Sequence, residues 1–72
     1  MAALADIIRE FIAELRTAGV RISVAESLDA MRAVSAAGLE RTRMREALAA
    51  TLIKDEADRA VFERVFAHWF GR

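Results

Sequence analysis

One serine stands where an acyl carrier protein would hold its phosphopantetheine group. Ser27 lies in the sequence Glu26-Ser27-Leu28-Asp29, at the start of an expected helix in a chain of 72 residues. Carrier proteins are strongly acidic, whereas this chain has 11 basic and 11 acidic residues. They also need a long loop before the serine, and only residues 20–22 are available here. The sequence favours a solvent-facing Ser27 in a first helical turn, and a carrier-protein-like domain is the weakest alternative.

The chain has one basic cluster, which consists of Arg41, Arg43 and Arg45 with Arg32 before it. On a helix that follows the turn at Gly38, such side chains would be placed to contact phosphates or base edges. However, Glu40 and Glu46 interrupt the run, and the balanced net charge argues against binding of nucleic acid through bulk charge. A solvated helix face is the favoured interpretation, and a small helical nucleic-acid-binding regulator is the alternative function.

The remaining residue types predict no catalytic or metal site. The chain has no cysteine and a single histidine, His68, so neither a thiolate site nor a histidine pair is available. A general base needs a positioned partner, and local spacing supplies none for His68. The acidic residues form no calcium loop, and no Gly-rich phosphate-binding loop is present. We therefore expect no catalytic residue, no metal and no cofactor.

Helices must position all these side chains, because the chain has no proline and only three glycines. Apolar residues recur at three- and four-residue spacing, and each glycine is placed to end a helix. The sequence predicts one all-α domain over residues 1–72. We expect a small bundle of about four short amphipathic helices, over residues 3–18, 23–36, 42–53 and 55–70.

Polar residues mark three of the helix starts. Ser23 and Glu26 have the spacing of a capping box, and Thr42 and Asp55 are candidate N-caps for the third and fourth helices. The apolar stripes define the expected core. The residues expected to face inward are Leu4, Ile7, Ile8, Phe11 and Leu15, then Val24, Leu28, Met31 and Val34, then Met44, Ala47, Leu48, Thr51 and Leu52, and finally Val61, Phe62, Val65, Phe66 and Trp69.

Apolar residues also flank two of the stripes. Phe70 lies about 100° round its helix from the centre of the stripe, and Ile12 is similarly offset in the first helix. Such residues either widen a buried face or mark a docking surface. Because the last turn is heavily aromatic, we predict a partner-binding surface made of Trp69, Phe70 and Ile12, with Arg41 and Arg45. We expect Phe70→Asp to weaken partner binding in a folded bundle, whereas unfolding would assign Phe70 to the core.

Charged residues interrupt every apolar stretch, so the sequence predicts no membrane span. The first charges, Asp6 and Arg9, come too early for a secretory signal peptide. The expected location is the cytoplasm.

Two stretches of the chain carry a resemblance to a known family. The first is Phe-Ile-Ala-Glu-Leu-Arg-Thr-Ala-Gly-Val over residues 11–20, followed by residues 22–26 and 29–30, and the second joins residues 47–54, 58–66 and 69–70. Together they resemble the N-terminal helical region of CoxE-like proteins that carry a von Willebrand factor A (VWA) domain. The resemblance implies an all-helical module beside a metal-binding VWA domain. The Asp-x-Ser-x-Ser motif of that domain is absent here, so no metal ligand carries over.

The resemblance also implies a function. CoxE-like proteins are similar to partners of MoxR-type AAA+ ATPases, and some are accessory factors in the maturation of metalloenzymes such as carbon monoxide dehydrogenase. We therefore expect a non-catalytic protein-interaction module whose partner is an AAA+ ATPase, a VWA domain or a metalloenzyme client. An exposed aromatic surface would also suit a second copy of the chain.

Overall fold

All regular secondary structure in residues 3–71, the part that the computed structural model describes, is helical. The elements are α1 (Leu4–Thr17), α2 (Val24–Ala37), α3 (Arg41–Leu52), the 3-10 turn η1 (Glu56–Asp58) and α4 (Arg59–Phe70). Each of the four predicted helices overlaps one of the observed α-helices. The predicted all-α fold is confirmed.

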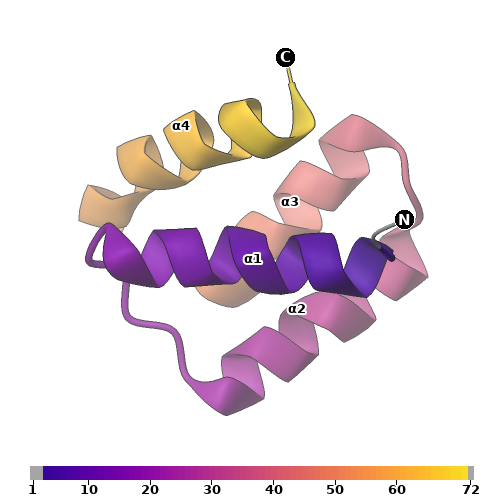
Figure 1. Ribbon diagram of the computed structural model, residues 1–72, viewed down its shortest axis with the longest axis horizontal. Coiled ribbons are helices and arrows are strands. Elements are labelled where there is room, and N and C mark those ends of the chain that lie inside the picture. The colour runs from indigo at the N-terminus through magenta and orange to yellow at the C-terminus, as the bar shows by residue number, and fades with distance from the viewer. Residues whose placement is uncertain (1–2, 72) are drawn as a thin grey trace.

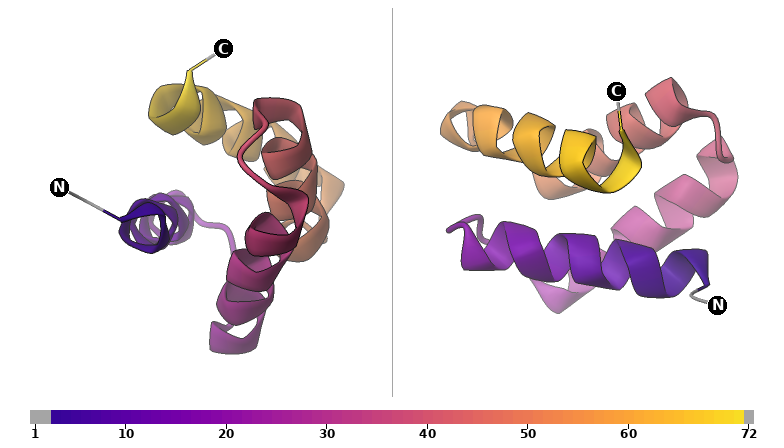
Figure 2. Two further views of the ribbon diagram at one scale, coloured as in Figure 1. Left: turned by 90° about the vertical axis from the view of Figure 1, so that its right-hand side faces the viewer. Right: turned by 45° about the horizontal axis from the view of Figure 1, so that its top comes forward.

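The four helices form two pairs. α1 and α4 lie side by side and run in opposite directions, while α2 and α3 pack against each other across them (Figure 1, Figure 2). The core between the pairs contains an aromatic cluster of four side chains, Phe11, Phe62, Phe66 and Phe70. The ring of Phe11 meets the other three nearly edge-on, at centroid distances of 5.8, 6.2 and 5.6 Å. The aromatic cluster therefore joins α1 to α4.

Gly19 ends α1 as predicted, in a Schellman motif. Its φ of +103° is a conformation that residues with a side chain rarely adopt. The N–H of Gly19 donates to the carbonyl of Arg16, and the N–H of Val20 donates to that of Leu15, both at 3.0 Å. Val20 and Leu15 are both buried, which supplies the apolar contact that accompanies this motif. The chain therefore turns sharply and directs the next residues toward α2.

The predicted capping box at the start of α2 is confirmed. The N–H of Glu26 donates to the Ser23 hydroxyl at 3.1 Å, and the N–H of Ser23 donates to the Glu26 carboxylate at 2.8 Å. Two amide donors that the helix leaves unpaired are thus satisfied.

We expect Ser23→Ala to lower the free energy of unfolding by about 1 kcal/mol, because the hydroxyl that accepts the Glu26 N–H is lost. Urea denaturation followed by circular dichroism measures this change. Ser35→Ala is the matched control, since Ser35 is an exposed serine inside the same helix, where alanine is the better helix former. A loss of stability in Ser35→Ala equal to that in Ser23→Ala would contradict the capping role.

Two predicted helix starts are wrong in detail. Glu40, not Thr42, caps α3: its carboxylate accepts the Thr42 N–H at 2.7 Å, and this bond lowers the pKa of Glu40 below its ordinary value. Asp55 does act as a cap, but for η1, where it accepts the Ala57 N–H at 2.9 Å. α4 then begins at Arg59, later than predicted. The helix is therefore capped two residues before the position that the sequence predicted.

The inward stripes of α3 and α4 are largely confirmed, whereas those of α1 and α2 are wrong at three positions. Val24 is 73% exposed, Leu28 is 50% exposed and Leu4 is 36% exposed. In α2 the buried side chains are Val34, as predicted, and Ala30, which was not predicted. The reason is the arrangement of the helices: α2 starts away from α1 and approaches it only toward its C-terminal end (Figure 1). An open groove therefore separates its first two turns from α1.

Candidate functional site

The hydroxyl of Ser27 is part of a local hydrogen-bond network. It donates to the carbonyl of Ser23 at 3.1 Å and accepts from the Arg16 guanidinium at 2.9 Å. Arg16 also donates to the carbonyl of Ile22 at 3.0 Å, so it ties α1 to the link that leads into α2. Ser27 thus has a structural role in this connection, and no observed feature presents it as an attachment site.

The three arginines of α3 do not form one patch. Arg41 donates to the carbonyl of Gly71 and lies 5.0 Å from the centre of the Phe66 ring. Arg45 lies 3.6 Å from the carboxylate of Glu63, so both side chains face α4. Arg43 is exposed and lies about 200° round the helix from Arg41. Two of the three charges are thus engaged within the chain, and the third points elsewhere.

His68 is exposed beside the edge of the Trp69 ring. Residues 3–71 hold no group of three or more His, Cys, Asp or Glu side chains able to bind a metal ion.

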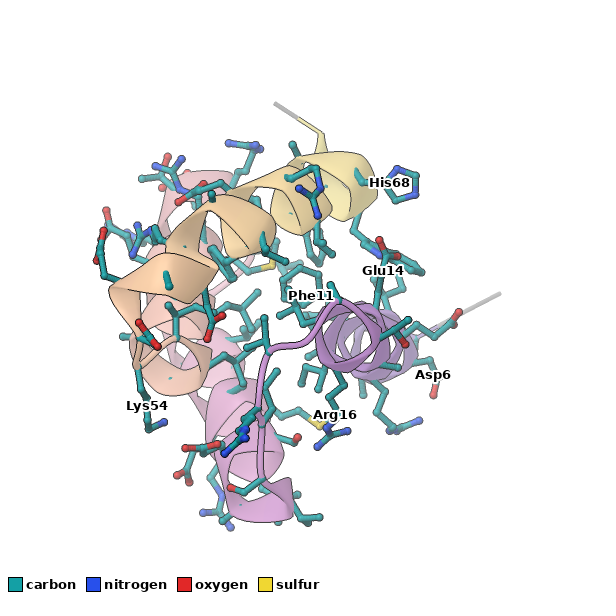
Figure 3. The ribbon with its side chains drawn as sticks, turned by 90° about the vertical axis from the view of Figure 1, so that its left-hand side faces the viewer. Asp6, Phe11, Glu14, Arg16, Lys54 and His68 are labelled. Carbon is teal, nitrogen blue, oxygen red and sulfur yellow. The ribbon has the colours of Figure 1, made fainter. Side chains whose placement is uncertain are left out.

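The aromatic end of α4 packs onto the bundle. The indole N–H of Trp69 donates to the Glu14 carboxylate at 2.8 Å, and the Phe70 ring lies 4.7 Å from that of Phe66. Figure 3 shows Glu14 on the side of α1 that faces α4, close to His68, with Phe11 between the two helices. Trp69 and Phe70 are half-buried, and Ile12 is only 1% exposed. Ile12 therefore widens the buried face of α1, and presents almost no surface of its own.

A groove between α1 and α2 contains most of the large apolar side chains that are exposed within residues 3–71. It consists of two adjoining hollows of about 260 and 370 Å³ that share Met31. Three of the four large apolar side chains that are exposed within residues 3–71 line it, namely Leu4, Val24 and Leu28. The apolar lining of this α1–α2 groove is Leu4, Ala5, Ile8, Ile12, Val24, Leu28, Met31 and Val34.

The α1–α2 groove was not predicted, because the apolar spacing of α2 assigned Val24 and Leu28 to the core. The heptad-like spacing of residues 24, 28, 31 and 34 is that of a buried stripe. A second signal in α2 was available: the small residues Ala30, Ala33 and Ala37 lie on another face and permit close packing against α3. A helix with two apolar faces buries one against its neighbour and leaves the other for a further contact.

A larger, open cleft of about 930 Å³ lies where the α1–α2 link meets the end of α3. Its lining carries both signs of charge, including Arg21, Glu26, Lys54 and Asp55. Glu26 is paired with Lys54, and the hydrogen bond from Lys54 together with that from the Ser23 N–H lowers the pKa of Glu26. Lys54 follows the C-terminal end of α3 (Figure 3). Within this cleft Glu26 pairs with Lys54, and the carboxylate of Asp55 accepts the Ala57 N–H.

The lowered pKa of Glu26 predicts a pH dependence of stability. Because the folded chain favours the carboxylate, the stabilisation is complete above the ordinary glutamate pKa of 4.5 and is lost as the pH falls through the lower, folded-state value. We expect the unfolding free energy of Glu26→Gln to depend less on pH below about 4.5 than that of the unaltered chain. NMR titration of the Glu26 side-chain carbon checks the cause: Lys54→Gln should raise the pKa of Glu26. An unchanged pKa in Lys54→Gln would contradict this assignment.

The fold and these sites define an all-helical bundle that carries an apolar groove between α1 and α2. Residues 8–72 match the family model of the CoxE N-terminal helical bundle domain. The chain belongs to this family, as the sequence resemblance predicted. Searches of curated proteins and of solved structures gave no match. Within the described part of the chain, every helix is too short or too polar to cross a membrane.

Proposed function

We propose that this chain is a non-catalytic protein-interaction module, and that its α1–α2 groove is the docking surface. The observation that carries the proposal is the gathering of exposed Leu4, Val24 and Leu28 at one place on a small bundle. Scattered apolar residues are normal on protein surfaces, but a contiguous patch marks an interaction site.

The family supports a choice of partners. By resemblance to CoxE-like proteins, the partner is a MoxR-type AAA+ ATPase, a VWA domain or a metalloenzyme client. A groove with an apolar floor and open ends suits any of these, since protein interfaces place apolar anchors at their centre and polar groups at the rim.

Leu28→Asp and Leu39→Asp together test this proposal. Both remove an exposed leucine and add the same charge, but Leu39, which is 72% exposed, lies in the α2–α3 connection outside the α1–α2 groove. We expect Leu28→Asp to weaken binding to the purified partner at least tenfold, or about 1.4 kcal/mol, and Leu39→Asp to change it less than about twofold. Isothermal titration calorimetry with each of the three candidate partners measures the affinities.

Circular dichroism should show both variants folded, because neither side chain is buried. Failure of all three purified candidates to bind would contradict the proposed function. Equal weakening in the two variants would exclude the α1–α2 groove as the docking surface.

A further inference from the structure

The charged residues that line the α1–α2 groove are both positive. Its lining includes two charged side chains, Arg9 and Arg16, and no carboxylate. The guanidinium of Arg16 is held at the groove by its bonds to Ile22 and Ser27, and Figure 3 shows it extending from α1 on the side of α2. Arg9 is exposed and paired with Asp6 at 2.7 Å, which lies outside the lining. An apolar floor is therefore bordered along α1 by positive charge.

The arrangement along α2 matches one helix lying in the groove. Val24, Leu28, Met31 and Ser35 succeed one another at four- and three-residue spacing on the exposed side of the helix. This is the ridge that a neighbouring helix packs against. An amphipathic helix that inserts its own i, i+3, i+4 and i+7 side chains would cover Val24 and Leu28 as a core helix does.

The same charges argue against a second copy of the chain. In a symmetric pair that shares this surface, each α1–α2 groove would face the other, and neither lining holds a carboxylate to pair with the arginines of its partner. Like charges placed opposite one another disfavour such a complex. The acidic counterpart must come from a different polypeptide segment.

We propose that the α1–α2 groove binds an amphipathic helix of a partner protein, with Asp or Glu residues along the flank that faces Arg9 and Arg16. This inference rests on the proposed function and adds the chemistry of the partner. The ion pair between Arg9 and Asp6 does not prevent it, because an exposed pair of this kind contributes little and exchanges readily with an incoming carboxylate.

A displayed library of helical peptides tests the proposal. Each peptide has about 18 residues, long enough to populate a helix, a fixed leucine stripe, and flanking positions randomised among Glu, Gln and Lys. Selection on the intact chain should enrich Glu on one flank, and the selected peptide should bind at least tenfold more tightly than its Lys-for-Glu counterpart. Enrichment of Lys or Gln would overturn the proposal. It would also be overturned if every selected peptide bound Leu28→Asp as well as the unaltered chain.

Charge reversal provides a second, independent readout. Arg9→Glu should weaken binding of the selected acidic peptide at least fivefold and improve binding of the Lys counterpart, whereas Arg43→Glu, at an exposed site on α3, should change neither more than about twofold. Equal effects of the two reversals would overturn the assignment of the acidic flank.

Other occupants are outcomes of the same experiments. Concentration-dependent dimerisation that Leu28→Asp abolishes would overturn the proposal in favour of a second copy. Binding to phosphatidylserine vesicles that Leu28→Asp abolishes would overturn it in favour of a lipid surface.

Failure of the inference is distinguishable from failure of the proposed function. A natural partner that binds equally well to Leu28→Asp and the unaltered chain refutes the groove but keeps the module. If an acidic peptide is selected but none of the three candidate partners binds, the inference about the groove stands and the proposed function fails.

Discussion

Phe11→Ala is expected to unfold most of the chain at moderate temperature. Phe11 is 0% exposed, and its ring contacts the three other rings of the aromatic cluster. Truncating a buried phenylalanine costs about 3–5 kcal/mol, because transfer energy is lost and a cavity remains. At about 0.05–0.15 kcal/mol per residue, a domain of this size has only about 4–11 kcal/mol in total. The substitution therefore removes a large part of the stability.

Thermal and urea denaturation, each followed by circular dichroism, measure this loss. Val24→Ala is the control, because it also removes apolar atoms from a helix, but from a side chain that is 73% exposed. Its effect should stay within about 0.5 kcal/mol. A Phe11→Ala variant as stable as Val24→Ala would show that α1 and α4 do not depend on the aromatic cluster.

Phe70→Asp is expected to destabilise the bundle, in contrast to the prediction from sequence that the bundle would stay folded. The Phe70 ring lies 5.6 Å from Phe11 and 4.7 Å from Phe66, so the side chain belongs to the edge of the core. Loss of a half-buried aromatic ring costs about 1.5–3 kcal/mol, and a carboxylate placed against these rings adds to that cost. Chemical denaturation should show a lower midpoint.

His68→Asp is the matched control for Phe70→Asp. It introduces the same charge into the same last turn of α4, but at an exposed residue. We expect it to cost at most about 1 kcal/mol, from the unfavourable placement of a negative charge at a helix C-terminus. Equal destabilisation by both variants would mean that charge, and not the lost ring, causes the effect. A docking role for Trp69 and Phe70 remains a prediction that partner binding must test.

Local rules in the sequence were enough to predict the helices. The Schellman glycine at Gly19 and the capping box of Ser23 and Glu26 depend only on residues within one or two turns, so short-range patterns reveal them. The buried stripe of α4 is equally local, since Phe62, Val65 and Phe66 all lie on one face. The family resemblance was also visible in the sequence, and the match over residues 8–72 confirms it.

The position of α1 relative to α2 could not be predicted in this way. Whether Val24 and Leu28 are buried depends on the distance between α1 and the first turns of α2. No single residue in either helix determines that distance. The packing of Arg41 and Arg45 toward α4 is likewise a contact between segments about 20–30 residues apart in the chain. Periodicity indicates which residues share a face, but the tertiary fold decides which faces are covered.

The contact between Arg41 and Gly71 has a consequence for motion at the end of α4. The last turn of a helix usually frays, because its carbonyls have no partner and its amides exchange readily with solvent. Here the guanidinium of Arg41, in the first turn of α3, holds the carbonyl that follows α4 and covers the Phe66 ring. We therefore expect hydrogen exchange at the last turn of α4 to be slower in the unaltered chain than in Arg41→Ala, which lacks this contact.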